Sequence, residues 1–232
     1  YDTSLKKVIK ETDASGSVTE YSYDADGSLT QITYPDGLSK TYSYDKTGRV
    51  IKTIEENGLE VLYGYDNAGR LTKKTVNNES TYTYEYDNNG NLISETDPEG
   101  NRVSYTYDVC NRQDSCTDAA GNKTTYTYDS NGNLLAVKDA LGNRKSYTYD
   151  KNGNVITATD ANGGVKQYLY NGIGLLISEK DAEGNVTNYA YNGNEKLISV
   201  ENALKAVTKY SYDKMGNLVS VIDALDNEYR LT

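Results

Sequence analysis

The chain has 232 residues and a formal net charge of -10, with 24 tyrosines but no Phe, Trp or His. The absence of His excludes imidazole-based catalysis and His-ligated zinc, and the acidic balance argues against nucleic-acid or anionic-membrane binding, which needs clustered Lys and Arg. No apolar run approaches the roughly 18 residues of a spanning helix, so we expect no membrane insertion.

The tetrapeptide Tyr-x-Tyr-Asp recurs ten times at a constant interval of 21 residues, with Asn in place of Asp at Asn171 and Asn192. A period of 20 to 50 residues indicates a repeat array rather than an ordinary globular domain. We therefore predict a single array of about eleven units over residues 1–232, cut from a longer repeat region. Near the start, Tyr1-Asp2 is one residue out of phase with Val8 and Gly16, which implies a local irregularity.

Each unit contains two turn signals of the form Asp-x-x-Gly-Asn, seen at residues 129–133 and 139–143. The Asp accepts hydrogen bonds from the backbone of its own turn, and the Gly supplies the left-handed conformation that closes a type I turn into a hairpin. The runs between the turns, residues 134–138 and 144–149, are short, rich in Leu, Val, Thr and Tyr, and lack a helical period. Each unit is therefore predicted to be a hairpin of two strands.

Several units lack a turn glycine. Asn111 is a tolerable substitute in the first turn, because Asn visits the left-handed region readily. Glu195 is not, and the preceding Gly193-Asn194 suggests that this turn has moved. In the second turn, Gly is missing in the units that contain Glu79, Lys205 and Asp226, so we expect looser hairpins or another turn there.

About 21 strands of about six residues, laid about 4.8 Å apart, would form a wide ribbon. Neighbouring strands rotate relative to one another, so such a ribbon must coil. The fold class is thus predicted to be all-β, an array of antiparallel hairpins forming a spiralling sheet wall, part of a shell or barrel. Tyrosines two residues apart share a face, where they would stack as ladders. A parallel β-roll with calcium at its turn aspartates is the competing geometry.

No residue pattern indicates catalysis. The aspartates repeat in turn register, and the calcium-like run Asp24 to Gly27 lacks the distal Glu of an EF-hand. Cys110 and Cys116 lie in one unit and are better interpreted as two unpaired thiols than as a disulfide, and no His is present to activate them. We expect no enzyme activity, no cofactor and no metal site.

The pattern Y-x-Y-D-x-x-G-x-L-x-x-x-x-D-x-x-G-N, complete from Tyr84 to Asn101, resembles the YD repeat of the RHS family. This family includes bacterial polymorphic toxins, insecticidal toxin complexes, wall-associated proteins and teneurins. The resemblance implies a hollow shell of spiralling strands that encloses or presents a C-terminal toxin or effector. It also implies an extracellular location, in a secreted or cell-surface protein that we expect to be bacterial. The partner of the array would be the rest of its own polypeptide.

Two alternatives remain open from the sequence: an extracellular carbohydrate-binding or adhesion module that exposes its tyrosines, and a filament that self-associates through sheet edges. Under each of these hypotheses, the residues expected to perform the function are those at the repeated positions. They are the first tyrosines Tyr21, Tyr42, Tyr63, Tyr84, Tyr105, Tyr126, Tyr147, Tyr168, Tyr189 and Tyr210; the second tyrosines Tyr23, Tyr44, Tyr65, Tyr86, Tyr107, Tyr128, Tyr149, Tyr170, Tyr191 and Tyr212; Asp24, Asp45, Asp66, Asp87, Asp108, Asp129, Asp150 and Asp213; and Gly27, Gly48, Gly69, Gly90, Gly132, Gly153, Gly174 and Gly216.

Overall fold

The computed structural model describes residues 6–231, which form strands and turns and contain no helix. The chain divides into two compact parts between Gly121 and Asn122. These parts are called the first and the second unit from here on, and a single 21-residue copy is called a repeat. The irregularity expected between Tyr1-Asp2 and Val8 falls largely outside the described residues. Short strands follow from the composition of each repeat, because Thr, Val, Ile and Tyr runs of five or six residues are bounded on both sides by Asp and Gly turns.

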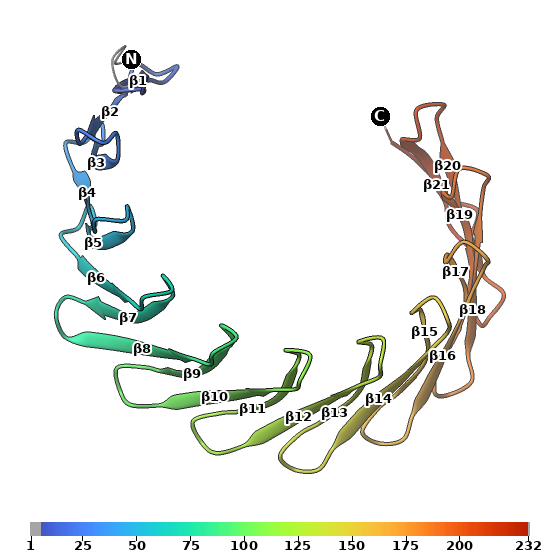
Figure 1. Cartoon of the computed structure of the whole chain (residues 1–232). Coiled ribbons are helices and arrows are strands. Elements are labelled where there is room, and N and C mark those ends of the chain that lie inside the picture. Colours follow the sequence, from blue (N-terminus) through green and yellow to red (C-terminus); the bar gives the residue numbers. More distant parts are fainter. Residues whose placement is uncertain (1–5, 232) are drawn as a thin grey trace. The chain divides into compact units, whose positions relative to one another are not determined.

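The first unit is a meander of eleven strands (Figure 1). They are β1 (Lys10–Thr12), β2 (Val18–Tyr23), β3 (Leu29–Thr33), β4 (Ser39–Tyr44), β5 (Val50–Ile54), β6 (Glu60–Tyr65), β7 (Leu71–Val76), β8 (Ser80–Tyr86), β9 (Leu92–Thr96), β10 (Arg102–Tyr107) and β11 (Gln113–Thr117). Each strand pairs antiparallel with the next one along the chain.

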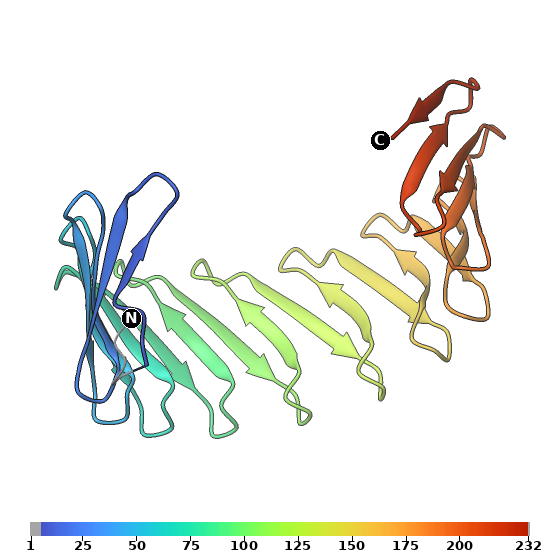
Figure 2. The same ribbon diagram turned by 90° about the horizontal axis from the view of Figure 1, so that it is seen from above.

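The second unit repeats this arrangement with another eleven strands (Figure 2). They are β12 (Lys123–Tyr128), β13 (Leu134–Lys138), β14 (Arg144–Tyr149), β15 (Val155–Thr159), β16 (Val165–Tyr170), β17 (Leu176–Lys180), β18 (Val186–Tyr191), β19 (Leu197–Glu201), β20 (Val207–Tyr212), β21 (Leu218–Ile222) and β22 (Glu228–Arg230). All its pairings between consecutive strands are antiparallel.

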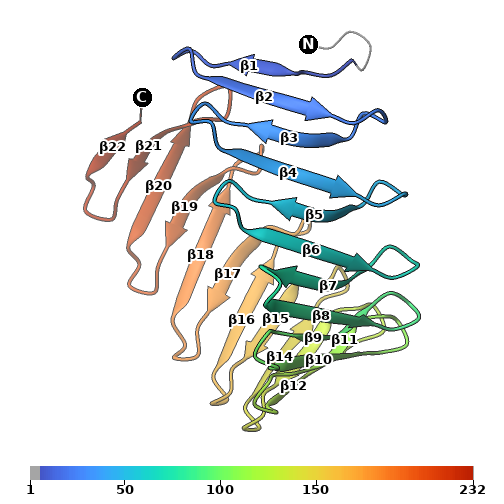
Figure 3. The same ribbon diagram turned by 90° about the vertical axis from the view of Figure 1, so that its left-hand side faces the viewer.

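The antiparallel hairpins predicted from the sequence are confirmed, and the parallel β-roll is excluded within each unit. Figure 3 shows consecutive strands lying side by side, with the turns along two rims, and within each unit the sheet twists and curves as strands are added. The rim made by the turns that follow Tyr-x-Tyr is called the first-turn rim below, and the opposite one the second-turn rim.

A β-bulge recurs in nearly every hairpin next to the first-turn rim. In β12 and β13, Tyr126 pairs with Val137 and Thr127 with Ala136, but Tyr128 pairs with Leu134, so Leu135 is the extra residue. The same shift occurs at the end of the other even-numbered strands from β2 to β20. Bulges increase the local twist of a strand pair, so a bulge in each repeat favours a sheet that curves steadily.

The two faces of the sheet differ in chemistry. The register places Tyr126, Val137 and Lys145 on one face, called the tyrosine face below, and Thr127, Ala136 and Ser146 on the other. Among the described residues only Val61 and Ala136 are buried hydrophobics, at 5% and 4% exposure. Most other strand side chains are half-buried, because a single-layer sheet has no second layer to cover it.

The repeated turn and tyrosine positions as candidate functional site

The first turn of each repeat is held by its aspartate, or by the asparagine that replaces it at Asn171 and Asn192. In the turn after Tyr128, the backbone amides of Asn131 and Asn133 both donate to Asp129 Oδ1 at 2.9 Å, and the Asn133 side-chain amide donates to Asp129 Oδ2. The Gly132 amide donates to the Asp129 carbonyl, and the Asp129 amide to the Asn133 carbonyl. Eight first-turn aspartates accept both backbone bonds in this way: Asp24, Asp45, Asp66, Asp87, Asp108, Asp129, Asp150 and Asp213.

The first-turn glycines all have positive φ. The angle lies between 81° and 92° at Gly27, Gly48, Gly69, Gly90, Gly132, Gly153, Gly174 and Gly216. The type I turn followed by a left-handed residue is thereby confirmed. Asn111, at φ 60°, adopts the same conformation, as expected.

The expectation that the turn near Glu195 has moved is wrong. The Glu195 amide donates to the Asn192 carbonyl and the Asn192 amide to the Lys196 carbonyl, which is the bonding of the other first turns. Glu195 itself has φ 62°. The strands on both sides fix the register, so this residue adopts the left-handed conformation although a side chain disfavours it.

The second turns without glycine behave in two ways. Lys205 and Asp226 take left-handed angles of 64° and 62° and keep the usual bonds, so these hairpins are not built on another turn. In the repeat with Glu79, the prediction of a different turn is confirmed. There Asn77 and Asn78 have φ 50° and 57°, and the Glu79 amide donates to the Val76 carbonyl, as in a type I′ turn. Val76 pairs with Ser80, so residues 77–79 make up the loop.

The second tyrosine bonds to the preceding strand of the meander, which belongs to the repeat before it when each repeat is counted from its Tyr-x-Tyr-Asp. Its hydroxyl donates to the backbone carbonyl of the residue fifteen positions earlier. This acceptor is the first residue of the preceding strand, except for Val8, which lies two residues before β1. The distances lie between 2.7 and 3.0 Å for Tyr23, Tyr44, Tyr65, Tyr86, Tyr107, Tyr149, Tyr191 and Tyr212. Burial raises the pKa of several of these phenols, as at Tyr44 and Tyr149. These side chains therefore connect successive repeats.

The first tyrosine bonds to a glutamate in three repeats whose preceding strand supplies one. The hydroxyls of Tyr21, Tyr105 and Tyr189 donate to the carboxylates of Glu11, Glu95 and Glu179 at 2.9, 2.7 and 2.8 Å. The bond to Glu95, together with burial, raises the pKa of Tyr105 to about 12. The pKa of Tyr189 is also raised to about 12, chiefly by burial and further by the bond to Glu179.

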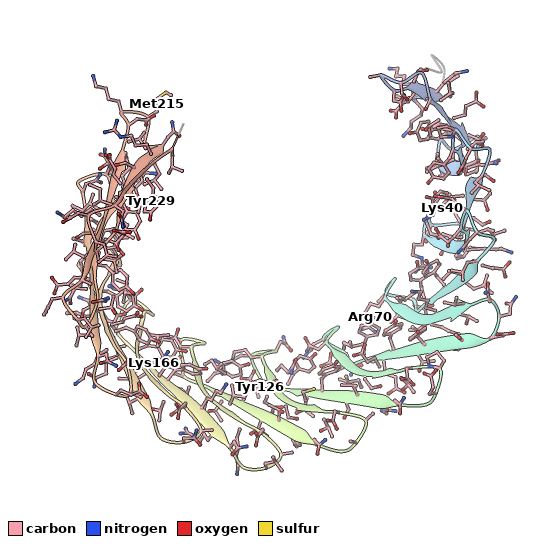
Figure 4. All side chains as sticks on the ribbon, turned by 180° about the vertical axis from the view of Figure 1, so that it is seen from behind. Lys40, Arg70, Tyr126, Lys166, Met215 and Tyr229 are labelled. Atoms are coloured by element: carbon pink, nitrogen blue, oxygen red, sulfur yellow. The ribbon has the colours of Figure 1, made fainter. Side chains whose placement is uncertain are left out.

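The remaining first tyrosines are half-buried, and Tyr126 is labelled on the tyrosine face in Figure 4. Their stacking into ladders stays a prediction.

Sequence reasoning missed an arginine that joins neighbouring first turns. Arg70 follows Gly69 and is labelled at the first-turn rim in Figure 4; its Nε donates to Asp66 Oδ2 at 2.7 Å within the turn. Its Nη1 donates to the carbonyl of Asp87 in the next first turn at 2.9 Å, and the guanidinium lies over the Tyr86 ring, 4.8 Å from its centroid. Arg49 makes the same three contacts with Asp45, Asp66 and Tyr65. An Arg directly after a turn Gly is the signal that could have revealed this clamp.

In residues 6–231 the cysteines do not form a disulfide, and the carboxylates do not gather into a metal site. Cys110 is exposed and Cys116 half-buried, and both are free thiols. Within the described range, no group of three or more Cys, Asp or Glu side chains is placed to hold a metal ion. The part of the chain that is described also contains no helix long and apolar enough to cross a membrane.

Comparison with known families agrees with this geometry. Residues 50–232 match the family described as Teneurin YD-shell, and residues 1–39 and 23–58 match the RHS repeat. The chain belongs to the teneurin YD-shell family, and it is built from YD repeats of the RHS type. A search of curated proteins found no match.

Among solved structures, the chain is similar in fold to three toxin assemblies. It superimposes on the crystal structure of TcdB2-TccC3-Cdc42 with a TM-score of 0.65 at 17% identity, covering 92% of this chain and 14% of that one. The crystal structure of TcdB2-TccC3-TEV gives a TM-score of 0.64 at 17% identity, with the same 92% and 14% coverage. A Photorhabdus luminescens Tc holotoxin pore with a substituted TccC3 gives 0.52 at 15% identity, covering 95% and 18%. The chain thus spans 14% to 18% of these three chains.

Proposed function

We propose that this repeat module forms part of the wall of a shell that encloses, or presents, a C-terminal toxin or effector segment of the same polypeptide. The role is structural and not catalytic. By its resemblance to RHS proteins the parent protein is expected to be secreted or displayed at a cell surface, in a bacterium.

The observation that carries the proposal is the bond from the second tyrosine to the preceding repeat. A wall that retains a folded or unfolded segment must resist local opening between its strands. The backbone pairing between β13 and β14 runs from the pair Lys138 and Arg144 to the pair Ala136 and Ser146. The ends of these two strands nearest the first-turn rim therefore have no backbone pairing with each other. The Tyr149 hydroxyl bonds to the Leu134 carbonyl in this gap. Repetition of this bond along the array supports a closed wall.

Protease protection tests the proposal in the complete polypeptide that contains this array. One variant would carry a thrombin site in the segment that follows the repeat region. A second would carry the same site in the first turn at Met215 (Figure 4), a residue that is 85% exposed. We expect cleavage at Met215 under native conditions and protection of the downstream site until denaturant is added. Equal cleavage rates at the two sites would overturn enclosure.

The carbohydrate-binding alternative predicts a different result. Binding of the isolated array to a glycan array, with loss on replacement of first tyrosines by Ala, would favour an adhesion role. The second tyrosines that bond to backbone carbonyls are already engaged in the fold, so an adhesion surface would depend on the first tyrosines.

A further inference from the structure

Two cations lie directly opposite each other at the second-turn rim of the second unit. Lys138 is the last residue of β13 and pairs with Arg144, the first residue of β14. Both are exposed, and both lie on the face opposite the tyrosines, because Val137 and Lys145 next to them belong to the tyrosine face. Like charges directly opposite each other on an antiparallel pair destabilise a sheet. An anion bound between Lys138 and Arg144 would therefore stabilise this part of the sheet.

The equivalent pair in the other hairpins of the two units is never two cations. It is Thr12 with Val18, Thr33 with Ser39, Ile54 with Glu60, Val76 with Ser80, Thr96 with Arg102, Thr159 with Val165, Lys180 with Val186, Glu201 with Val207, and Ile222 with Glu228. The repeat itself therefore does not require basic residues at these positions.

A third cation extends the pair into a cluster. Lys123 lies on β12, two residues before Thr125, which pairs with Lys138. Side chains at such diagonal positions are about 7 to 8 Å apart, within reach of long side chains. Lys123 is exposed, and it lies on the same face as Lys138 and Arg144.

No carboxylate in residues 6–231 forms an ion pair with Lys123, Lys138 or Arg144. The adjacent Asp139 is held in its own turn, where it accepts bonds from the amides of Leu141 and Asn143 and from the Asn143 side chain.

In the first unit, two cations on the corresponding face have carboxylate partners. On the corresponding face, Lys52 forms an ion pair with Glu60, and Arg102 forms one with Glu85 at 2.7 Å. Three cations without a carboxylate partner, gathered on one face, thus distinguish β12 to β14 from the equivalent face of the first unit.

We propose that Lys123, Lys138 and Arg144 form a binding site for a phosphate group. The guanidinium fork of Arg matches phosphate oxygens in a bidentate way, and two ammonium groups can approach the remaining oxygens. A phosphate monoester carries about -1.5 to -2 charges at neutral pH and offers three free oxygens, which suits three cations better than a carboxylate does. The net charge of -10 repels extended polyanions, so a compact anion fits this cluster better than nucleic acid.

Titration of the ¹⁵N-labelled 232-residue chain, followed by NMR at low ionic strength, tests the site. The probes are inorganic phosphate and O-phosphoserine, which distinguish a free ion from a phosphoryl group on a larger molecule. We expect shifts confined to residues of β12 to β14, with a Kd on the order of 1 mM for either probe. Tighter binding of O-phosphoserine would identify a phosphorylated molecule as the ligand, and equal binding would identify the free ion.

Two substitutions make the test specific. Arg144→Ser should weaken binding about tenfold. Lys145→Ser changes the net charge equally but alters the opposite face, so it should leave the Kd unchanged.

A third variant separates loss of the site from loss of the fold. Lys138→Glu places a carboxylate opposite Arg144, so it should abolish binding while raising the unfolding midpoint. Shifts spread over many lysines, or equal effects of Arg144→Ser and Lys145→Ser on the Kd, would overturn the proposal.

Discussion

The hydroxyl of Tyr149 donates to the backbone carbonyl of Leu134, 2.7 Å away, where the ladder between β13 and β14 has ended. The bond gives a partner to a carbonyl that lies outside the β13–β14 pairing. It also explains why the second tyrosine, with its long reach and single polar tip, suits this position throughout the array. The hydroxyl, more than the ring alone, connects one repeat to the next.

Tyr149→Phe should therefore lower the free energy of unfolding by about 1 kcal/mol, because the Leu134 carbonyl loses its partner while the ring remains. Urea denaturation measures this change, because a shift of the midpoint with the same dependence of the free energy of unfolding on urea concentration reports a change in stability. Tyr147→Phe is the matched control, since the Tyr147 hydroxyl makes no hydrogen bond within the described residues. An equal effect of the two substitutions would contradict the role given to the second hydroxyl.

Glu195→Gly should stabilise the protein by about 1 kcal/mol, because Glu195 adopts φ 62° and glycine has no side chain to disfavour that angle. Gly48→Val is the opposite test. Gly48 has φ 81° and open space around the position of a Cβ atom, so any loss of stability, expected to be about 1 to 2 kcal/mol, comes from the backbone. Thermal or urea unfolding of both variants measures the two changes in stability. An unchanged stability of Glu195→Gly would show that the strain at this turn is relieved elsewhere.

Arg70→Asn should destabilise the first unit by about 1 to 2 kcal/mol, through loss of the bond to the Asp87 carbonyl and of the contact with the Tyr86 ring. Asn is the natural residue at the equivalent position in Asn133 and Asn154, where it bonds to the aspartate of its own turn. The turn itself should thus survive the change. Asn154→Arg is the reciprocal variant and should raise stability; no change in either would show that the clamp adds nothing beyond the turn.

The strands, their antiparallel pairing and the turn aspartates and glycines could all be predicted from the sequence. They depend on neighbouring residues, so a constant period of 21 residues was enough to locate them. The unmoved turn at Glu195 depends instead on two flanking strands whose register overrides one unfavourable residue. Local composition, which favoured a shift toward Gly193, carries no information about that register.

The bonding partners were harder to predict than the elements. The Tyr149 hydroxyl reaches a carbonyl, and every residue has one, so nothing in the residue type at Leu134 marks it as the acceptor. The acceptor is determined by where the ladder ends and where the bulge at Leu135 lies. The Arg70 clamp likewise depends on the distance between adjacent turns, which follows from the pairing of the strands and not from the motif.

At high pH, the bond between Tyr105 and Glu95 should become a source of instability. The pKa of Tyr105 is raised from 10.0 to about 12, so its contribution to stability is complete below pH 10 and is lost as the pH rises through 12. Tyr105→Phe should remove this part of the alkaline decline in the urea midpoint, whereas titration of the lysines affects both proteins alike. Glu95→Gln keeps an acceptor without the charge, so the decline should still begin near pH 10 but should be smaller and should end at a lower pH. Identical profiles for all three proteins would argue against the bond.

At low pH, the turn aspartates should lose their stabilising effect. The side-chain bond from Asn154, and then the backbone amides of the turn, lower the pKa of Asp150 below its usual 3.8. A lowered pKa in the folded state means that the contribution is present above pH 3.8 and is lost as the pH falls through the folded value. Asp150→Asn retains an acceptor, as Asn171 does naturally when it binds the amides of Ile173 and Leu175. The variant should be less stable than the parent at neutral pH, and the difference should shrink as the solution is acidified below the pKa of Asp150. A difference in urea midpoint that stays constant over this range would show that the charge of Asp150 does not contribute to the turn.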